Sequence, residues 1–130
     1  MSPQRILQIN ALSTAACALA MLAARELLHP LFGLDTPVVL DGVAAAFIAY
    51  AGLLAFASVR RPVGRQVLLA FTIADAAWVA ASAVALILFW DQLTPLARFL
   101  IVAVAGVVEV FATLQYRAAG KARNGSLQVA

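Results

Sequence analysis

The chain has 130 residues, of which 65% are hydrophobic and 12% are charged, and its formal net charge is +3. A soluble domain is closer to half apolar and a quarter charged, and one this small could not bury so much apolar surface. The composition therefore excludes a water-soluble globular domain, and basic residues placed between apolar segments indicate membrane orientation signals rather than nucleic-acid binding.

The first apolar stretch covers residues 6–28 and is interrupted by Gln8 and Asn10. It follows a single basic residue, Arg5, whereas a cleaved signal peptide has a more basic start and an unbroken apolar segment. We therefore expect this stretch to be retained as a membrane span. The next residues, 29–37, include two prolines and one glycine, which is typical of a loop.

Three further apolar stretches cover residues 38–59, 67–90 and 95–116. At ~1.5 Å per residue, helices of this length reach about 33–36 Å and cross a hydrocarbon core of ~30 Å. They lack strand-like alternation, and lipid offers no partner to a free backbone amide, so helices are expected. Thr94, next to a proline, has the position of a helix N-cap. Residues 120–130 are polar and are expected to end the last helix and fray.

The connections between the stretches are short, so neighbouring helices should be antiparallel. We therefore predict one all-α domain, residues 1–130, that forms a four-transmembrane-helix up-down-up-down bundle. Arg25 and Arg98 lie toward one side of such a bundle. The other seven of the nine basic residues lie on the opposite side: Arg5, Arg60, Arg61, Arg65, Arg117, Lys121 and Arg123. This excess predicts that both termini are cytoplasmic, in a bacterial-type inner (plasma) membrane that the chain crosses several times.

Polar residues recur at one depth in all four stretches. Asp75 and Glu109 each lie about 5 Å to the cytoplasmic side of the middle of their helices, at ~1.5 Å per residue. Tyr50 and Thr14 fall near the same level on the other two stretches. Because polar groups avoid lipid, these residues are expected to point into the bundle.

Residues one helical turn away extend these polar faces. Thr72 shares a face with Asp75, Thr113 shares one with Glu109, and Asn10 precedes Thr14 by four residues. Trp78 lies one turn beyond Asp75, where it could wall a pocket, stack on a cation, or simply pack against a neighbour.

The two acids are predicted to interact if they face each other. At ~4 Å and an effective dielectric constant of ~20, two carboxylates repel by about 4 kcal/mol, so Asp75 and Glu109 should then share one proton. The sequence places no Lys, Arg or His at this depth. A proton, water in a cavity, or a cation from outside the chain must therefore quench the charge.

Intramembrane acids without a basic mate often mark ion pathways, so our first hypothesis is a proton- or cation-linked transporter or a binder of basic solutes. Its binding residues would be Asp75, Glu109, Tyr50, Trp78, Thr72 and Thr113. The structural interpretation also stands: both acids could be protonated and hold helices together through hydrogen bonds.

The alternative function is a non-catalytic accessory subunit or assembly factor of a larger membrane complex. Small-residue stripes on the first two stretches permit close helix packing, either within the bundle, in a homo-oligomer or against other membrane proteins. We expect no enzyme activity, because no nucleophile–base pair occurs. No cofactor is predicted, and no metal site either, since Cys17 and His29 are the only soft ligands. The lipid bilayer is the expected partner, and nucleic acid is not.

Overall fold

The computed structural model describes the backbone of residues 2–60 and 62–129 and the side chains of residues 2–60 and 62–121. Within this part of the chain the structure is all-helical, with five helices and no strands: α1 (Pro3–Ala23), α2 (Arg25–Leu31), α3 (Val38–Ser58), α4 (Arg65–Leu88) and α5 (Pro95–Val129). The four long helices are long and apolar enough to cross a membrane. The predicted all-α membrane class is thus confirmed, and the chain is a multi-pass membrane protein.

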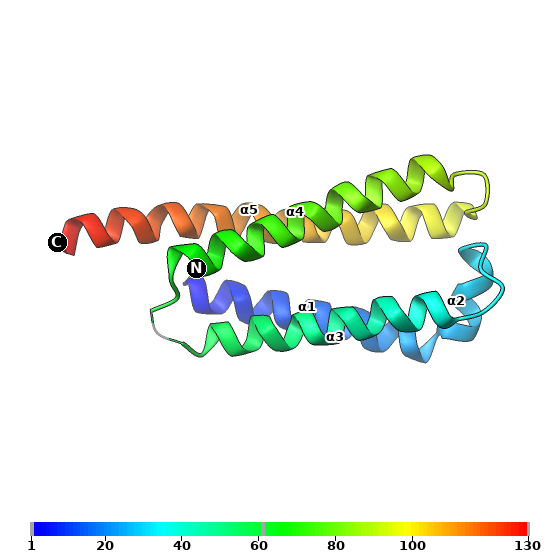
Figure 1. Ribbon diagram of the computed structural model, residues 1–130, viewed down its shortest axis with the longest axis horizontal. Coiled ribbons are helices and arrows are strands. Elements are labelled where there is room, and N and C mark those ends of the chain that lie inside the picture. Colours follow the sequence, from blue (N-terminus) through cyan, green and yellow to red (C-terminus); the bar gives the residue numbers. More distant parts are fainter. Residues whose placement is uncertain (1, 61, 130) are drawn as a thin grey trace.

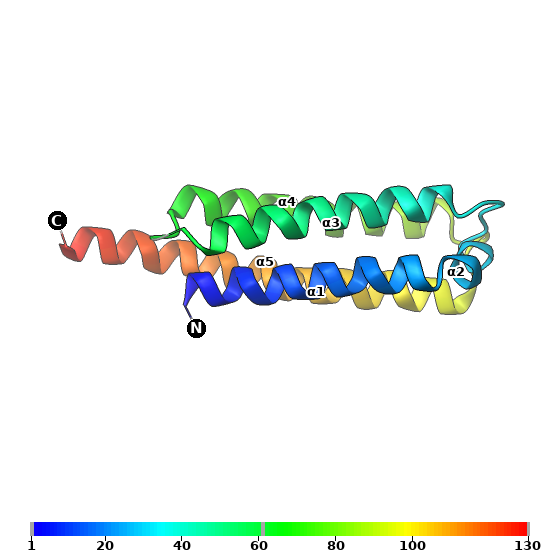
Figure 2. The same ribbon diagram turned by 90° about the horizontal axis from the view of Figure 1, so that it is seen from below.

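The four long helices form two layers, with α1 and α3 in one and α4 and α5 in the other (Figure 1). Figure 2 places α1 beside α5 and α3 beside α4, so the helices stand at the corners of a square. Consecutive long helices run in opposite directions, and both chain ends lie at one end of the bundle (Figure 1). At that end α5 projects beyond the other helices.

The helix starts follow from local chemistry. The Ser2 hydroxyl accepts a hydrogen bond from Arg5 N at 3.2 Å, which caps α1. The predicted N-cap at Thr94 is confirmed, because its hydroxyl oxygen accepts a hydrogen bond from Ala97 N at 3.2 Å. The same hydroxyl donates to Leu31 O at 3.0 Å, so the start of α5 is tied to the end of α2.

Two predicted boundaries are wrong. The first span ends at Ala23 rather than Leu28, because Ala24 leaves helical geometry (φ −106°, ψ 16°) and α2 takes a new direction. The last helix does not end at Gly120 but continues to Val129. One glycine in a helix costs only about 1 kcal/mol relative to alanine, and no proline follows Pro95 to stop the helix. Residue 130, the end of the predicted frayed tail, lies outside the described residues.

The tightest apolar packing lies near the end of the bundle that holds both termini. Leu7, Leu54 and Leu68, from three different helices, are fully buried there beside Ala119 of α5. Most other large apolar side chains point outward, as Leu12 (71% exposed) and Ile87 (77% exposed) do. Such a surface is one that a lipid bilayer, rather than water, solvates.

Basic residues gather at the end that holds the termini. The described ones begin α1, follow α3, begin α4 or lie on the part of α5 beyond the apolar stretch: Arg5, Arg60, Arg65, Arg117 and Lys121. Arg61 and the side chain of Arg123, which also entered the orientation prediction, lie outside the described residues.

Candidate functional site

Asp75, on α4, is the centre of a buried polar network. Its side chain is only 4% exposed, and it accepts hydrogen bonds from the three other long helices. Tyr50 of α3 donates its hydroxyl to Oδ1 at 2.7 Å. Gln115 of α5 and Asn10 of α1 donate their amide nitrogens to Oδ2 at 2.9 Å and 3.2 Å. Each of the other three spans therefore contributes one polar side chain to the carboxyl group that α4 carries.

The two amides of this network are also bonded to each other. The Asn10 amide nitrogen donates a second hydrogen bond to Gln115 Oε1 at 2.8 Å. The Thr14 hydroxyl donates to Asn10 Oδ1 at 3.2 Å. Both hydrogens and the oxygen of the Asn10 amide thus have partners, and the Gln115 side chain is completely buried. A network satisfied in this way fixes the rotation of each helix about its axis, because a small rotation would leave polar groups unpaired.

The three hydrogen bonds to the Asp75 carboxyl group come from uncharged donors, and none of the described side chains brings a positive charge to it. A carboxylate at a helix centre costs about 2.5–3.5 kcal/mol to insert into a bilayer. A hydrogen bond to a charged group contributes about 1.5–3 kcal/mol, so three such bonds are large enough to offset that cost. The site can therefore hold an ionised carboxylate in the bundle without a basic partner.

Aromatic side chains fill the space between α3 and α4 beside the network. Tyr50 packs edge-on against Phe71, with ring centroids 5.7 Å apart, and its hydroxyl also lies 3.4 Å from Phe71 O. Phe47 and Trp78 form a second edge-on pair at 4.8 Å. The Trp78 indole nitrogen is buried and has no hydrogen-bond partner among the described residues. Trp78 thus lies one turn from Asp75 without joining its network.

The predicted pair of acids does not form. Glu109 lies on the exposed side of α5, whereas Asp75 is bonded to Gln115, which is on the inner face of the same helix. Six residues separate Glu109 from Gln115, which corresponds to ~9 Å along the axis and ~120° around it. The shared-proton hypothesis is therefore wrong, since α5 cannot turn both side chains toward Asp75.

The two predicted threonines also bond elsewhere. The Thr72 hydroxyl donates to Leu68 O at 2.8 Å, within α4. The Thr113 hydroxyl donates to Glu109 O at 3.0 Å, within α5, and Thr113 is exposed. Of the six predicted binding residues, only Asp75 and Tyr50 are joined by a hydrogen bond between their side chains, because Thr113 binds the backbone carbonyl of Glu109 and not its carboxyl group.

Sequence reasoning missed two members of the site. Asn10 is not among the predicted binding residues, although its spacing from Thr14 indicates an inward face. Gln115 was missed because the last span was expected to end at Tyr116, which set Gln115 outside the polar layer. In the structure α5 continues past Gln115 to Val129, and its rotation turns the Gln115 side chain into the bundle, which helix length alone does not reveal.

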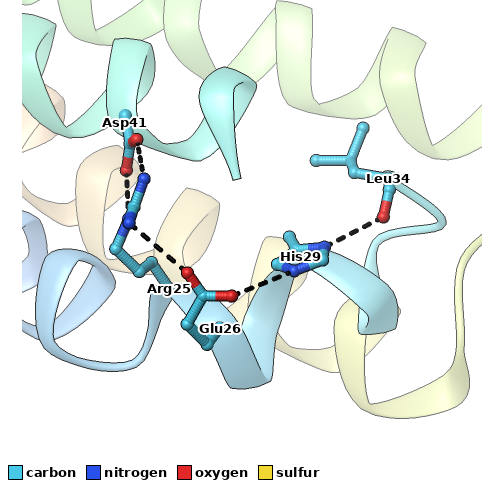
Figure 3. Close-up of polar contacts among 5 residues, drawn as sticks. All are labelled: Arg25, Glu26, His29, Leu34 and Asp41. Atoms are coloured by element: carbon cyan, nitrogen blue, oxygen red, sulfur yellow. Dashed lines mark hydrogen bonds and ion pairs between the residues drawn. The ribbon is translucent and has the colours of Figure 1, made fainter. Parts of the chain in front are cut away.

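A second polar cluster ties α2 to α3 at the end of the bundle opposite the termini (Figure 3). The Arg25 guanidinium donates to both carboxylate oxygens of Asp41, with Nε 2.9 Å from Oδ1. Glu26 lies between Arg25 and His29, at 3.4 Å and 3.5 Å. The hydrogen bond with Asp41 raises the pKa of Arg25 above its ordinary value. This cluster anchors α2, because the Arg25 guanidinium makes a charged, two-pronged hydrogen bond to Asp41 in the first turn of α3.

The fold and the two clusters define a small four-span membrane protein with one buried carboxylate shared by all of its spans. No group of three or more potential metal ligands occurs among the described residues. No protein-family model, curated protein or solved structure matches the chain.

Proposed function

We propose that Asp75 binds and releases a proton, or a monovalent cation in its place, and that the chain acts as a proton- or cation-linked membrane transport protein. The observation that carries the proposal is the carboxyl group that accepts hydrogen bonds from three other spans and has no basic partner among the described residues. A change of charge at such a group acts on α1, α3, α4 and α5 together. Membrane acids of this kind commonly belong to proton or ion pathways.

Tyr50 provides a simple way to accommodate the proton. Its hydroxyl hydrogen has two acceptors in reach, Asp75 Oδ1 at 2.7 Å and Phe71 O at 3.4 Å. When Asp75 is ionised, the hydroxyl donates to the carboxylate. When Oδ1 carries a proton, that proton is donated to the Tyr50 oxygen, and the Tyr50 hydrogen turns to Phe71 O. Both charge states are then hydrogen-bonded after rotation of one hydroxyl.

A monovalent cation would use the same groups differently. The Asn10 and Gln115 amides would have to present their oxygens to the cation, which breaks the bond between them and frees the Thr14 hydroxyl.

We further propose that both termini face the cytoplasm of a bacterial-type cell. Support for this orientation comes from the basic residues at the end of the bundle that holds the termini.

The test is the titration of Asp75 in purified protein reconstituted into liposomes. Infrared difference spectra between high and low pH should contain a carboxyl C=O band that disappears in Asp75→Asn. The matched control is Asp35→Asn, which removes an exposed acid from a loop and should leave the band unchanged. Proton uptake driven by a potassium diffusion potential, followed with a dye inside the liposomes, should fall to the protein-free rate in Asp75→Asn. Wild-type uptake equal to that of Asp75→Asn would contradict the transport function.

The closure of the network also favours a second function, that of an accessory subunit or assembly factor. Each hydrogen bond to Asp75 joins α4 to another span, so the network is also compatible with a purely structural role in which it holds the bundle in one shape. In that case Asp75→Asn should lower the stability of the bundle without any change in proton uptake. A second membrane protein should then purify with the chain in a fixed ratio.

A further inference from the structure

Glu109 presents a carboxyl group to the outside of the bundle at a depth where lipid chains should be. It lies about 5 Å from the middle of the apolar stretch 95–116, at ~1.5 Å per residue. It is exposed, and no described side chain donates a hydrogen bond to its carboxyl group. An acid in contact with hydrocarbon is unfavourable whether or not it is charged, because neither form finds a hydrogen-bond partner there. Another polar surface must therefore cover this part of α5.

The neighbours of Glu109 provide the chemistry that such a cover would need. Thr113, one turn further along α5, is also exposed. Its hydroxyl hydrogen is donated to Glu109 O at 3.0 Å, so the hydroxyl oxygen remains free to accept a bond from outside. Gly106, one turn before Glu109, is exposed, and a Cβ atom added there would meet nothing within 4 Å. Close packing within the chain therefore does not require this mid-helix glycine.

We propose that this outer face of α5, formed by Gly106, Glu109 and Thr113, pairs with the same face of a second copy of the chain. A two-fold interface uses one patch twice, so the patch must contain both members of each hydrogen bond. This face does so, because a protonated Glu109 carboxyl donates to the Thr113 hydroxyl of the second copy, and the reverse bond forms by symmetry. Gly106 and Thr113 are seven residues apart, the repeat of a left-handed helix pair, and their small size allows the two helices to approach closely.

The charge distribution determines the direction of the pair. The basic residues at one end of the bundle orient every copy in the same way across the membrane, so the two α5 helices run parallel. A foreign partner would have to supply its own hydrogen-bonding group at the depth of Glu109, whereas a second copy supplies one with Thr113. The interface is independent of the buried Asp75 network, which lies on the inner face of α5.

Cysteine cross-linking in native membranes tests the interface. With Cys17 replaced by serine, Gly106→Cys should form a disulfide-linked dimer on mild oxidation. Gly52→Cys is the matched control, because Gly52 is also an exposed mid-helix glycine with open space around it, on α3. It should give at least tenfold less dimer. Equal cross-linking at both positions, or cross-linking only at Gly52, would overturn the proposal.

The equilibrium between monomer and dimer in liposomes provides the second measurement. Copies labelled with one fluorophore and diluted into phosphatidylethanolamine and phosphatidylglycerol should bleach in two steps. Gly106→Leu and Glu109→Ala should lower the ratio of two-step to single-step bleaching at least tenfold. Glu109→Gln keeps a hydrogen-bond donor and should still bleach in two steps. Single-step bleaching of the wild type at every dilution would refute the dimer. Capture of position 106 by a different membrane protein in cells, in place of a second copy, would do the same.

Discussion

Tyr50 accounts for every hydrogen bond described between α3 and α4, and its shortest one, at 2.7 Å, is to Asp75. These helices do not pack as closely as α1 with α3 or α4 with α5. The larger Tyr50 and Phe71 rings fill the wider space and carry a hydroxyl across it to the carboxyl group. The contact between the two layers at this corner of the bundle is thus both aromatic and polar.

Replacement of Tyr50 by phenylalanine should destabilise the bundle while the ring packing is kept. The change leaves Asp75 Oδ1 without its donor, and loss of a hydrogen bond to a charged group costs about 1.5–3 kcal/mol. Unfolding in mixed micelles, followed by circular dichroism, measures the difference. Tyr116→Phe is the control, because Tyr116 is 65% exposed and should change stability by less than about 0.5 kcal/mol. Equal losses in both variants would show that the Tyr50 hydroxyl has no special role.

Asn10 and Gln115 should behave as a coupled pair. Each binds Asp75 and the other, so Asn10→Ala already removes part of what Gln115→Ala would remove. A double-mutant cycle on unfolding free energies should give an interaction energy of about 0.5–3 kcal/mol. Asn10→Ala combined with Thr94→Ala, at the opposite end of the bundle, should be additive to within about 0.5 kcal/mol. Additivity of the first pair would contradict the network.

Thr94→Ala should loosen the start of α5 and its junction with α2. The substitution removes the N-cap to Ala97 and the side-chain bond to Leu31 O, while the bond from Thr94 N to Leu31 O at 3.1 Å remains. Loss of an N-cap costs about 0.5–2 kcal/mol. Faster amide hydrogen exchange in the first turn of α5 is the expected readout. Thr94→Ser keeps the hydroxyl and should retain wild-type protection, and a serine variant as fast as alanine would argue against the cap.

The contribution of the Arg25–Asp41 pair to stability should be nearly independent of pH above neutrality. The hydrogen bond between the two side chains raises the pKa of Arg25, and both groups are charged at neutral pH. Above neutrality the contribution of the pair therefore stays complete up to the ordinary guanidinium pKa and is lost as the pH rises through the higher folded value. The side chains are 39% and 34% exposed, so solvent screens the pair and Arg25→Gln should lower the melting temperature only slightly. That loss should be equal at about pH 7 and pH 10, and smaller in high salt. Thermal melts at the two pH values check this, and a loss that disappears at the higher pH would contradict it.

The sequence alone determined the class of the protein and the approximate position of each span. Apolar stretches of membrane length bounded by prolines, glycines and charges are sufficient, because lipid permits few structures other than helices. It also placed Asp75 and Tyr50 at one depth, since depth follows from the rise per residue along a helix. The errors lie where local signals are weak, at Ala24 and Gly120, because neither residue prevents or requires a helix by itself.

The tertiary structure decided which side of each helix faces inward. The spans are apolar around most of their circumference, so the helical periodicity of apolar residues does not mark the buried face. Packing against the other helices sets the rotation of each helix about its axis. That rotation turned Glu109 outward and brought Gln115 to Asp75, although these two lie 40 residues apart in the chain. It also joined Asn10 to both across separations of 65 and 105 residues. Contacts of this range depend on the mutual orientation of four helices, which no single helix contains.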